Sequence, residues 1–184
     1  MPSWQFPHAG SGVGSEEPAR RVLQFALVDL HEFLIAPIAY LAPEQALEGL
    51  SAADAVRRPQ GLSHSVAEIV AHLSFWQNWF YARCTGDAQP VVASAAAGWP
   101  AVVPDGWPDI RSRFVGRLHE LGALAKGDVS RPVTPSIEFP PLAHYTIADA
   151  LVHVATHNAH HLGQVIAIRQ LLGAWPPPAG SWTW

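Results

Sequence analysis

The chain has 184 residues, of which 49% are hydrophobic and 14% charged, and its formal net charge is -4. This apolar content can bury one sizeable core, so we expect a single domain. The eleven Lys and Arg residues are scattered along the sequence, and without a basic stripe we expect no nucleic-acid partner. One cysteine excludes an intramolecular disulfide and a thiolate-based structural zinc site. Any metal ion would therefore need nitrogen or oxygen ligands, which the ten histidines can supply.

The sequence gives no sign of secretion or of a membrane span. Residues 1–14 lack the basic segment and apolar core of a secretory signal. The longest apolar stretch, residues 22–42, is interrupted by Asp29, His31 and Glu32, which leaves too short a span for a membrane helix. We therefore expect a cytoplasmic protein with no membrane partner.

The first part of the chain predicts an arm and one helix. Residues 1–15 are rich in Gly, Pro and Ser and lack periodicity, which is typical of a flexible arm. Apolar residues then recur at steps of three or four and predict a helix over residues 18–36. Pro37 should kink or end this helix.

Two capping patterns and one proline mark the starts of three further helices. Ser65 followed by Glu68 fits a capping box, and helical periodicity continues to Phe80. A third helix is predicted from residue 107 to about residue 124, with a proline in its first turn. The fourth begins after Thr146, has a long apolar stripe, and runs on to Gly173.

These four helices predict an all-α four-helix bundle over residues 16–173, with long crossover loops at roughly residues 42–64, 86–106 and 127–145. The tail, residues 174–184, is rich in Pro and Trp. It is expected either to fold over its own core or to form an interface with a second subunit, and the sequence leaves both open.

Four histidines lie within nine residues of the fourth predicted helix: His153, His157, His160 and His161. At about 100° per residue, His157 and His161 fall on or beside the apolar arc, whereas the other two lie beyond its opposite edge. The i, i+4 spacing places two imidazoles on one patch, and His72, at the edge of the second helix's buried stripe, can face them. These three side chains are candidate metal ligands. Hydrogen-bonded core histidines would produce the same spacing, so the pattern alone leaves both interpretations open, although unpartnered buried imidazoles are costly.

Two segments resemble the DinB-like superfamily, which includes YfiT-like metal-dependent hydrolases and mycothiol- or bacillithiol-dependent transferases. They are Ser65–Leu73 (SVAEIVAHL) and His157–Gln164 (HNAHHLGQ). The resemblance spans about residues 16–173. It implies a four-helix bundle with long crossovers, a metal such as zinc or nickel, a three-histidine metal site and frequent homodimers. Residue 162 is Leu where many members carry Arg, and this departure concerns the outer shell of the site more than its metal ligands.

Carried over residue by residue, the resemblance implies His72, His157 and His161 as metal ligands. Three neutral imidazoles leave a divalent ion its charge and an open position, where it can acidify a water for hydrolysis or a low-molecular-weight thiol for S-transfer. The second interpretation is a metal- or small-molecule-binding stress-response bundle without turnover. The sequence identifies neither the small-molecule substrate nor a catalytic residue.

Two side chains are candidates for the outer shell of such a site. Glu68 lies one turn before the second-helix histidine, but the capping box already explains it. Gln164 could hydrogen-bond a ligand or water, or simply join two helices. His153 and His160 are expected in the outer shell or at the surface, and His144 is the histidine expected to approach the site from a loop.

Overall fold

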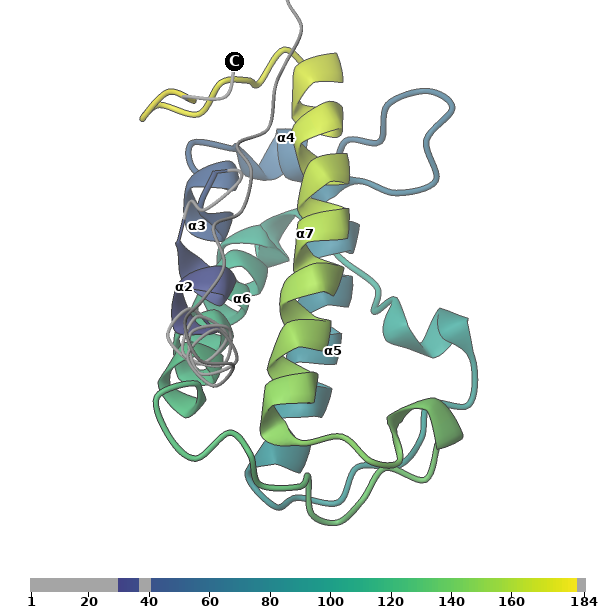
Figure 1. Cartoon of the computed structure of the whole chain (residues 1–184). Helices are drawn as coiled ribbons and strands as arrows, with labels where there is room; N and C mark the ends of the chain where they lie inside the picture. Colours follow the sequence, from purple (N-terminus) through teal and green to yellow (C-terminus); the bar gives the residue numbers. More distant parts are fainter. Residues whose placement is uncertain (1–29, 37–40, 182–184) are drawn as a thin grey trace, which may run out of the picture.

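The computed structural model describes residues 30–36 and 41–181, and over these ranges the chain is helical with no β-strand. The helices are α2 (Leu30–Ile35), α3 (Pro43–Ala46), α4 (Ala52–Val56), α5 (Val66–Cys84), α6 (Trp107–Leu124) and α7 (Ile147–Leu171) (Figure 1). Short 3-10 turns occur at η1 (Ala95–Gly98), η2 (Pro104–Gly106) and η3 (Pro140–Leu142). The all-α prediction is confirmed.

The two helices that carry the candidate ligands begin at the predicted capping boxes. Ser65 Oγ accepts from the backbone N–H of Glu68, and the Glu68 carboxylate accepts from the backbone N–H of Ser65. Thr146 and Asp149 make the same reciprocal pair at the start of α7. Each box satisfies backbone donors that the first turn leaves without helical partners, which fixes where the helix starts.

The long helices pack around a common core. α5 contacts both α6 and α7, and α2 contacts α6 and α7. α7 runs alongside α5 for most of its length (Figure 1). Fully buried apolar side chains such as Leu73, Phe114 and Leu151 fill the space between these helices. Among the residues described, no helix is both long and apolar enough to cross a membrane.

The first helix and the first connection differ from the sequence-based picture. Of the helix predicted over residues 18–36, only α2 lies within the described residues. The connection at residues 42–64 is not a plain crossover, because it contains α3 and α4. Pro43 occupies the first turn of α3, and the Ser51 side chain caps α4, which are local signals for short helices.

The described part of the tail folds back on the helices. Gly173, two residues after the end of α7, adopts the left-handed conformation (φ 70°), and the backbone N–H of Ala174 donates to the carbonyl of Arg169. Trp175 then packs against a buried cluster that includes Leu162, and the Arg169 guanidinium lies 5.5 Å from the centre of the Trp175 ring. The predicted interface role of Trp182 and Trp184 lies outside the described residues.

Candidate metal centre

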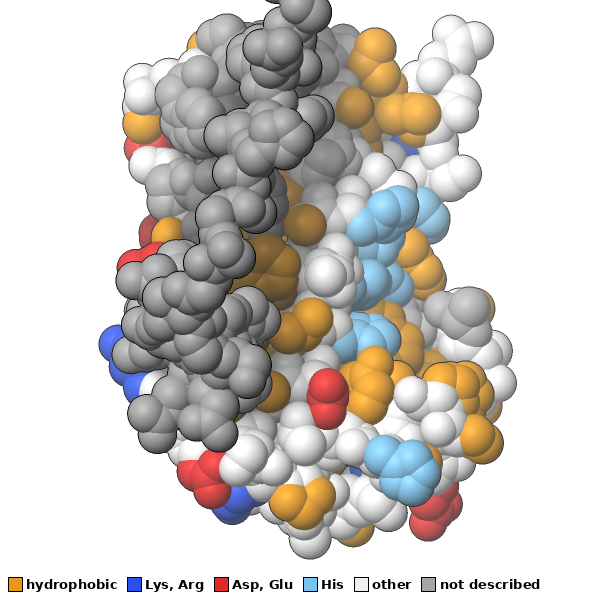
Figure 2. All heavy atoms as spheres, viewed as in Figure 1, with side chains coloured by type: hydrophobic (Ala, Val, Ile, Leu, Met, Phe, Trp, Pro, Cys, Tyr) orange, Lys and Arg blue, Asp and Glu red, His pale blue; other side chains and the backbone are white. Residues whose placement is uncertain are grey.

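The structure brings together His72 from α5 with His157 and His161 from α7. One ring nitrogen from each of the three lies within 4.8 Å of the other two. His72 Nε2 and His157 Nε2 are 3.3 Å apart, and the His157 and His161 ring centres are separated by 4.7 Å. On the surface, histidine side chains gather along one face of the molecule (Figure 2). Helix geometry therefore places the i, i+4 pair opposite the histidine of the facing helix.

Hydrogen bonds at the other ring nitrogen orient two of the three imidazoles. His72 Nδ1 donates to the carbonyl oxygen of Gly98 at 2.6 Å. His161 Nδ1 lies 2.8 Å from Gln164 Oε1 and donates to it. A proton on Nδ1 leaves Nε2 of the same ring with a free electron pair. This is the arrangement in which metal-binding histidines are held by a neighbouring carbonyl or amide.

Burial favours the neutral form of all three imidazoles by lowering their pKa values. Burial, together with the neighbouring His161 and His72, lowers the pKa of His157 to about 3. Burial also lowers the pKa of His72, although the Gly98 carbonyl acts in the opposite direction. Burial likewise lowers the pKa of His161, against the hydrogen bond to Gln164. Since a histidine binds a metal through its neutral form, the cluster is poised to act as a ligand set at neutral pH.

The donor set fits a divalent cation. Tetrahedral zinc with Zn–N bonds of about 2.0–2.1 Å holds its nitrogens about 3.3–3.4 Å apart, and the two Nε2 atoms of His72 and His157 are separated by 3.3 Å. Because His72 carries its proton on Nδ1, the contact at this separation is a hydrogen bond from His157 to His72, and a metal ion would take the place of the shared proton. Three imidazoles without a thiolate suit zinc or nickel better than magnesium or calcium.

An aromatic stack beside the cluster was not predicted from the sequence. The Trp99 ring lies between the rings of His64 and His72, at centre-to-centre distances of 3.8 Å and 3.9 Å and nearly parallel to both. Trp99 follows η1 in the connection between α5 and α6, where no periodic pattern exists to place it. This connection also supplies the Gly98 carbonyl, so a loop fixes the orientation of a helical histidine.

Of the two side chains predicted for the outer shell, the structure places one in contact with the cluster and gives the other different partners. Gln164, predicted for the outer shell, contacts His161 and also lies 3.4 Å from His160, which is exposed. The Glu68 carboxylate is bonded to the Ser65 N–H and to Arg58, and none of the described hydrogen bonds joins it to the cluster.

The predicted approach of His144 to the site is not seen. This side chain is exposed, and His64 rather than His144 stacks beside the cluster from a connecting segment. His153 lies one turn before His157 and pairs with Tyr145, at 3.0 Å between Nδ1 and the hydroxyl oxygen. Cys84, at the end of α5, is buried, and burial raises the pKa of its thiol to about 11.

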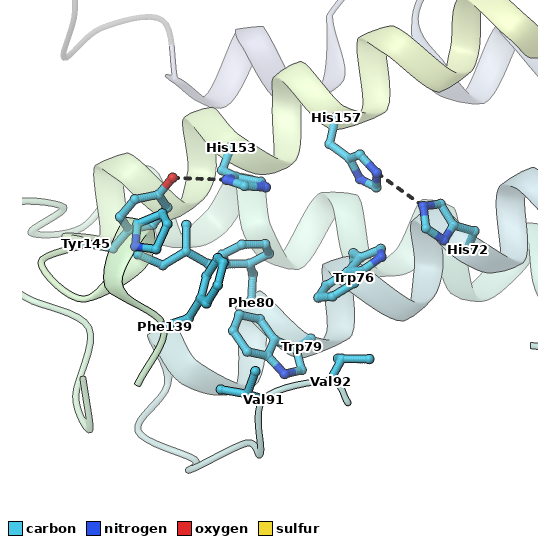
Figure 3. A pocket seen from close by; sticks show the side chains of 12 residues that line it. His72, Trp76, Trp79, Phe80, Val91, Val92, Phe139, Tyr145, His153 and His157 are labelled. Atoms are coloured by element: carbon cyan, nitrogen blue, oxygen red, sulfur yellow. Dashed lines mark hydrogen bonds between the residues drawn. The ribbon is translucent and has the colours of Figure 1, made fainter. Parts of the chain in front are cut away.

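A chamber of about 600 Å³ opens beside the cluster and is lined at one end by His72 and His157. Most of its remaining wall is aromatic or aliphatic, and His153 and Tyr145 stand at its other end (Figure 3). Its volume lies in the range of about 300–1,000 Å³ that is typical of small-molecule sites. The chamber gives a ligand access to the imidazoles of His72 and His157.

The fold and the cluster define an all-α protein with a three-histidine group suited to a metal ion. The chain belongs to the DinB superfamily, whose family model matches residues 42–165 and covers both segments that carry the candidate ligands. The resemblance inferred from the sequence is thereby confirmed. No curated protein and no solved structure matches the chain.

Proposed function

We propose that the chain binds one divalent metal ion through His72, His157 and His161 and acts as a metal-dependent enzyme on a small molecule, by hydrolysis or by S-transfer from a low-molecular-weight thiol. The observation that carries the proposal is the convergence of three neutral imidazoles, two of them oriented by Gly98 and Gln164. Zinc or nickel is the metal that this ligand set favours.

Different residues would hold the metal ion and orient its ligands. The three imidazoles hold the ion, and because none is anionic they leave its positive charge undiminished. The Gly98 carbonyl and the Gln164 amide keep two of the rings in the tautomer that binds. When bound, the ion supplies Lewis acidity, which lowers the pKa of a water or thiol near it. The mostly apolar lining of the chamber offers bulk water few hydrogen-bonding partners beside the ion.

Metal content tests the ligand assignment. Protein purified without a histidine tag or chelator should contain close to one divalent ion per chain by elemental analysis. His157→Ala and His161→Ala should lower this content sharply, whereas His153→Ala and His160→Ala, on the same helix, should keep it. Circular dichroism should show that all four variants remain helical, because the core is apolar. Absence of stoichiometric metal after reconstitution, or loss of metal in His153→Ala but not in His161→Ala, would contradict the assignment.

Turnover separates an enzyme from a binding module. The metal-loaded protein is assayed against a panel of esters, and against electrophiles together with mycothiol, bacillithiol or glutathione. Activity that depends on metal and is lost in His161→Ala supports the enzyme, and the panel that responds identifies the reaction. Full metal loading without turnover on either panel would favour a non-catalytic binding bundle.

A further inference from the structure

The chamber beside the cluster has a uniform chemical character. Of the described residues that line it, none is Lys, Arg, Asp or Glu. One side of the chamber is lined by three aromatic side chains of α5, namely Trp76, Trp79 and Phe80 (Figure 3). A charged ligand would lose its hydration there without gaining a charged partner, and a sugar-like ligand would find few hydrogen-bonding partners. A flat apolar ligand would bury surface against the rings.

One polar group faces this apolar space at a distance from the metal centre. His153 lies four residues before His157, about 6 Å along α7, and its Nδ1 is paired with the Tyr145 hydroxyl. Whichever way that bond runs, Nε2 keeps one hydrogen-bonding function, as a donor or as an acceptor. Within the described part of the chain, no hydrogen bond engages this nitrogen. Figure 3 shows His153 and His157 on the same helix, on the same side of the chamber.

We infer that the chamber binds a neutral aromatic small molecule, with its ring against Trp76, Trp79 and Phe80 and one uncharged hydrogen-bonding group at His153. In the proposed enzyme this molecule is the substrate, and it reacts at the end of the chamber that is lined by His72 and His157. A polar low-molecular-weight thiol is not the molecule that occupies the chamber. The role as substrate rests on the proposed function, whereas binding of the molecule does not require the metal.

Binding is measured by equilibrium dialysis of 2-naphthol against the full chain freed of metal. Leu142 lines the chamber, and Leu171 is exposed at the end of α7, so the same substitution can be placed inside and outside. Leu142→Trp should weaken binding at least tenfold by filling the space, while Leu171→Trp should leave it unchanged. Equal affinities for the two variants, or no binding at millimolar concentration, would overturn the proposal.

The polar contact is tested with ligands that differ in one group. Unsubstituted naphthalene should bind about three- to tenfold more weakly than 2-naphthol, the range expected for one neutral hydrogen bond. His153→Phe keeps a ring in place and should abolish this difference while leaving naphthalene binding unchanged. If 2-naphthoate bound more tightly than 2-naphthol, or if His153→Phe left the preference intact, the assignment would be wrong.

The two proposals fail in different measurements. Dialysis of the metal-free chain reports only on the chamber, and elemental analysis reports only on the three ligand histidines. Naphthol binding without stoichiometric metal would support the chamber as a binding site and contradict the metal centre. Metal loading with equal naphthol affinities in Leu142→Trp and Leu171→Trp would support the metal centre and contradict the chamber as a binding site.

Discussion

Replacing Gln164 tests whether the outer hydrogen bond to His161 contributes to metal binding. The bond of 2.8 Å keeps the proton on Nδ1 of that imidazole and therefore leaves Nε2 free. In Gln164→Leu the ring can move its proton to Nε2, and the metal must then compete with this tautomer. Loss of such an outer partner typically lowers metal affinity about 10- to 100-fold, or roughly 1.4–2.7 kcal/mol. Because Gln164 is exposed, water can partly replace it, so we expect a loss of about tenfold.

The assay is zinc competition against a chelator of known affinity, followed optically. Gln170→Leu provides the matched control, since Gln170 is exposed on the same helix and more than one turn further on. Gln164→Glu should shift affinity the other way, because a carboxylate makes the imidazole a stronger ligand. Unchanged affinity in Gln164→Leu, or equal losses in the Gln164 and Gln170 variants, would refute the reasoning.

Further predictions concern stability, the thiol and assembly. The buried Arg169 donates to three backbone carbonyls. Arg169→Met should therefore lower the free energy of unfolding, measured in urea, by about 3–5 kcal/mol. Arg113→Met, at an exposed position, is the control, and an equally small loss in both variants would contradict this prediction. Burial raises the pKa of Glu68, but hydrogen bonds from Ser65 and Arg58 outweigh it and lower the pKa overall. The stabilisation from Glu68 should therefore be complete above its unfolded-state pKa of about 4.3. In urea unfolding, the difference in free energy of unfolding between the unaltered protein and Glu68→Gln should shrink as the pH falls below that value. A difference that stays constant with pH would argue against this prediction. Cys84, with a pKa of about 11, should resist iodoacetamide at pH 8 until urea unfolds the chain, and rapid alkylation of the native protein would contradict its burial. We also expect a homodimer, and sedimentation as a 19.9 kDa monomer at micromolar concentration would count against it.

Much of the fold could be predicted because its signals are local. The capping boxes at Ser65 and Thr146 act within a single turn, so the sequence shows where α5 and α7 begin. The apolar stripes extend through each long helix and predict which face is buried. The short helices α3 and α4 were missed, because four or five residues give too little periodicity to recognise.

The histidine cluster divides into a part that sequence can predict and a part that it cannot. His157 and His161 are related by helix geometry alone, and His72 follows from its position on the buried edge of α5. Trp99 and the Gly98 carbonyl come from a connection whose path depends on tertiary packing. The chamber is equally non-local, since its walls come from two helices and two connections.

The departure at residue 162 has a different consequence from the one expected from sequence. Adjacent helical residues point about 100° apart, so while His161 faces α5, Leu162 faces away from it. Leu162 is fully buried and packs with Leu41 and Ala46, in the cluster that also receives Trp175 of the tail. A leucine here therefore serves packing between α7, α3 and the tail. The outer contacts of His161 and His72 come from elsewhere, namely from Gln164 on the next turn and from a loop carbonyl. The absence of an arginine therefore does not leave these two histidines without orienting partners.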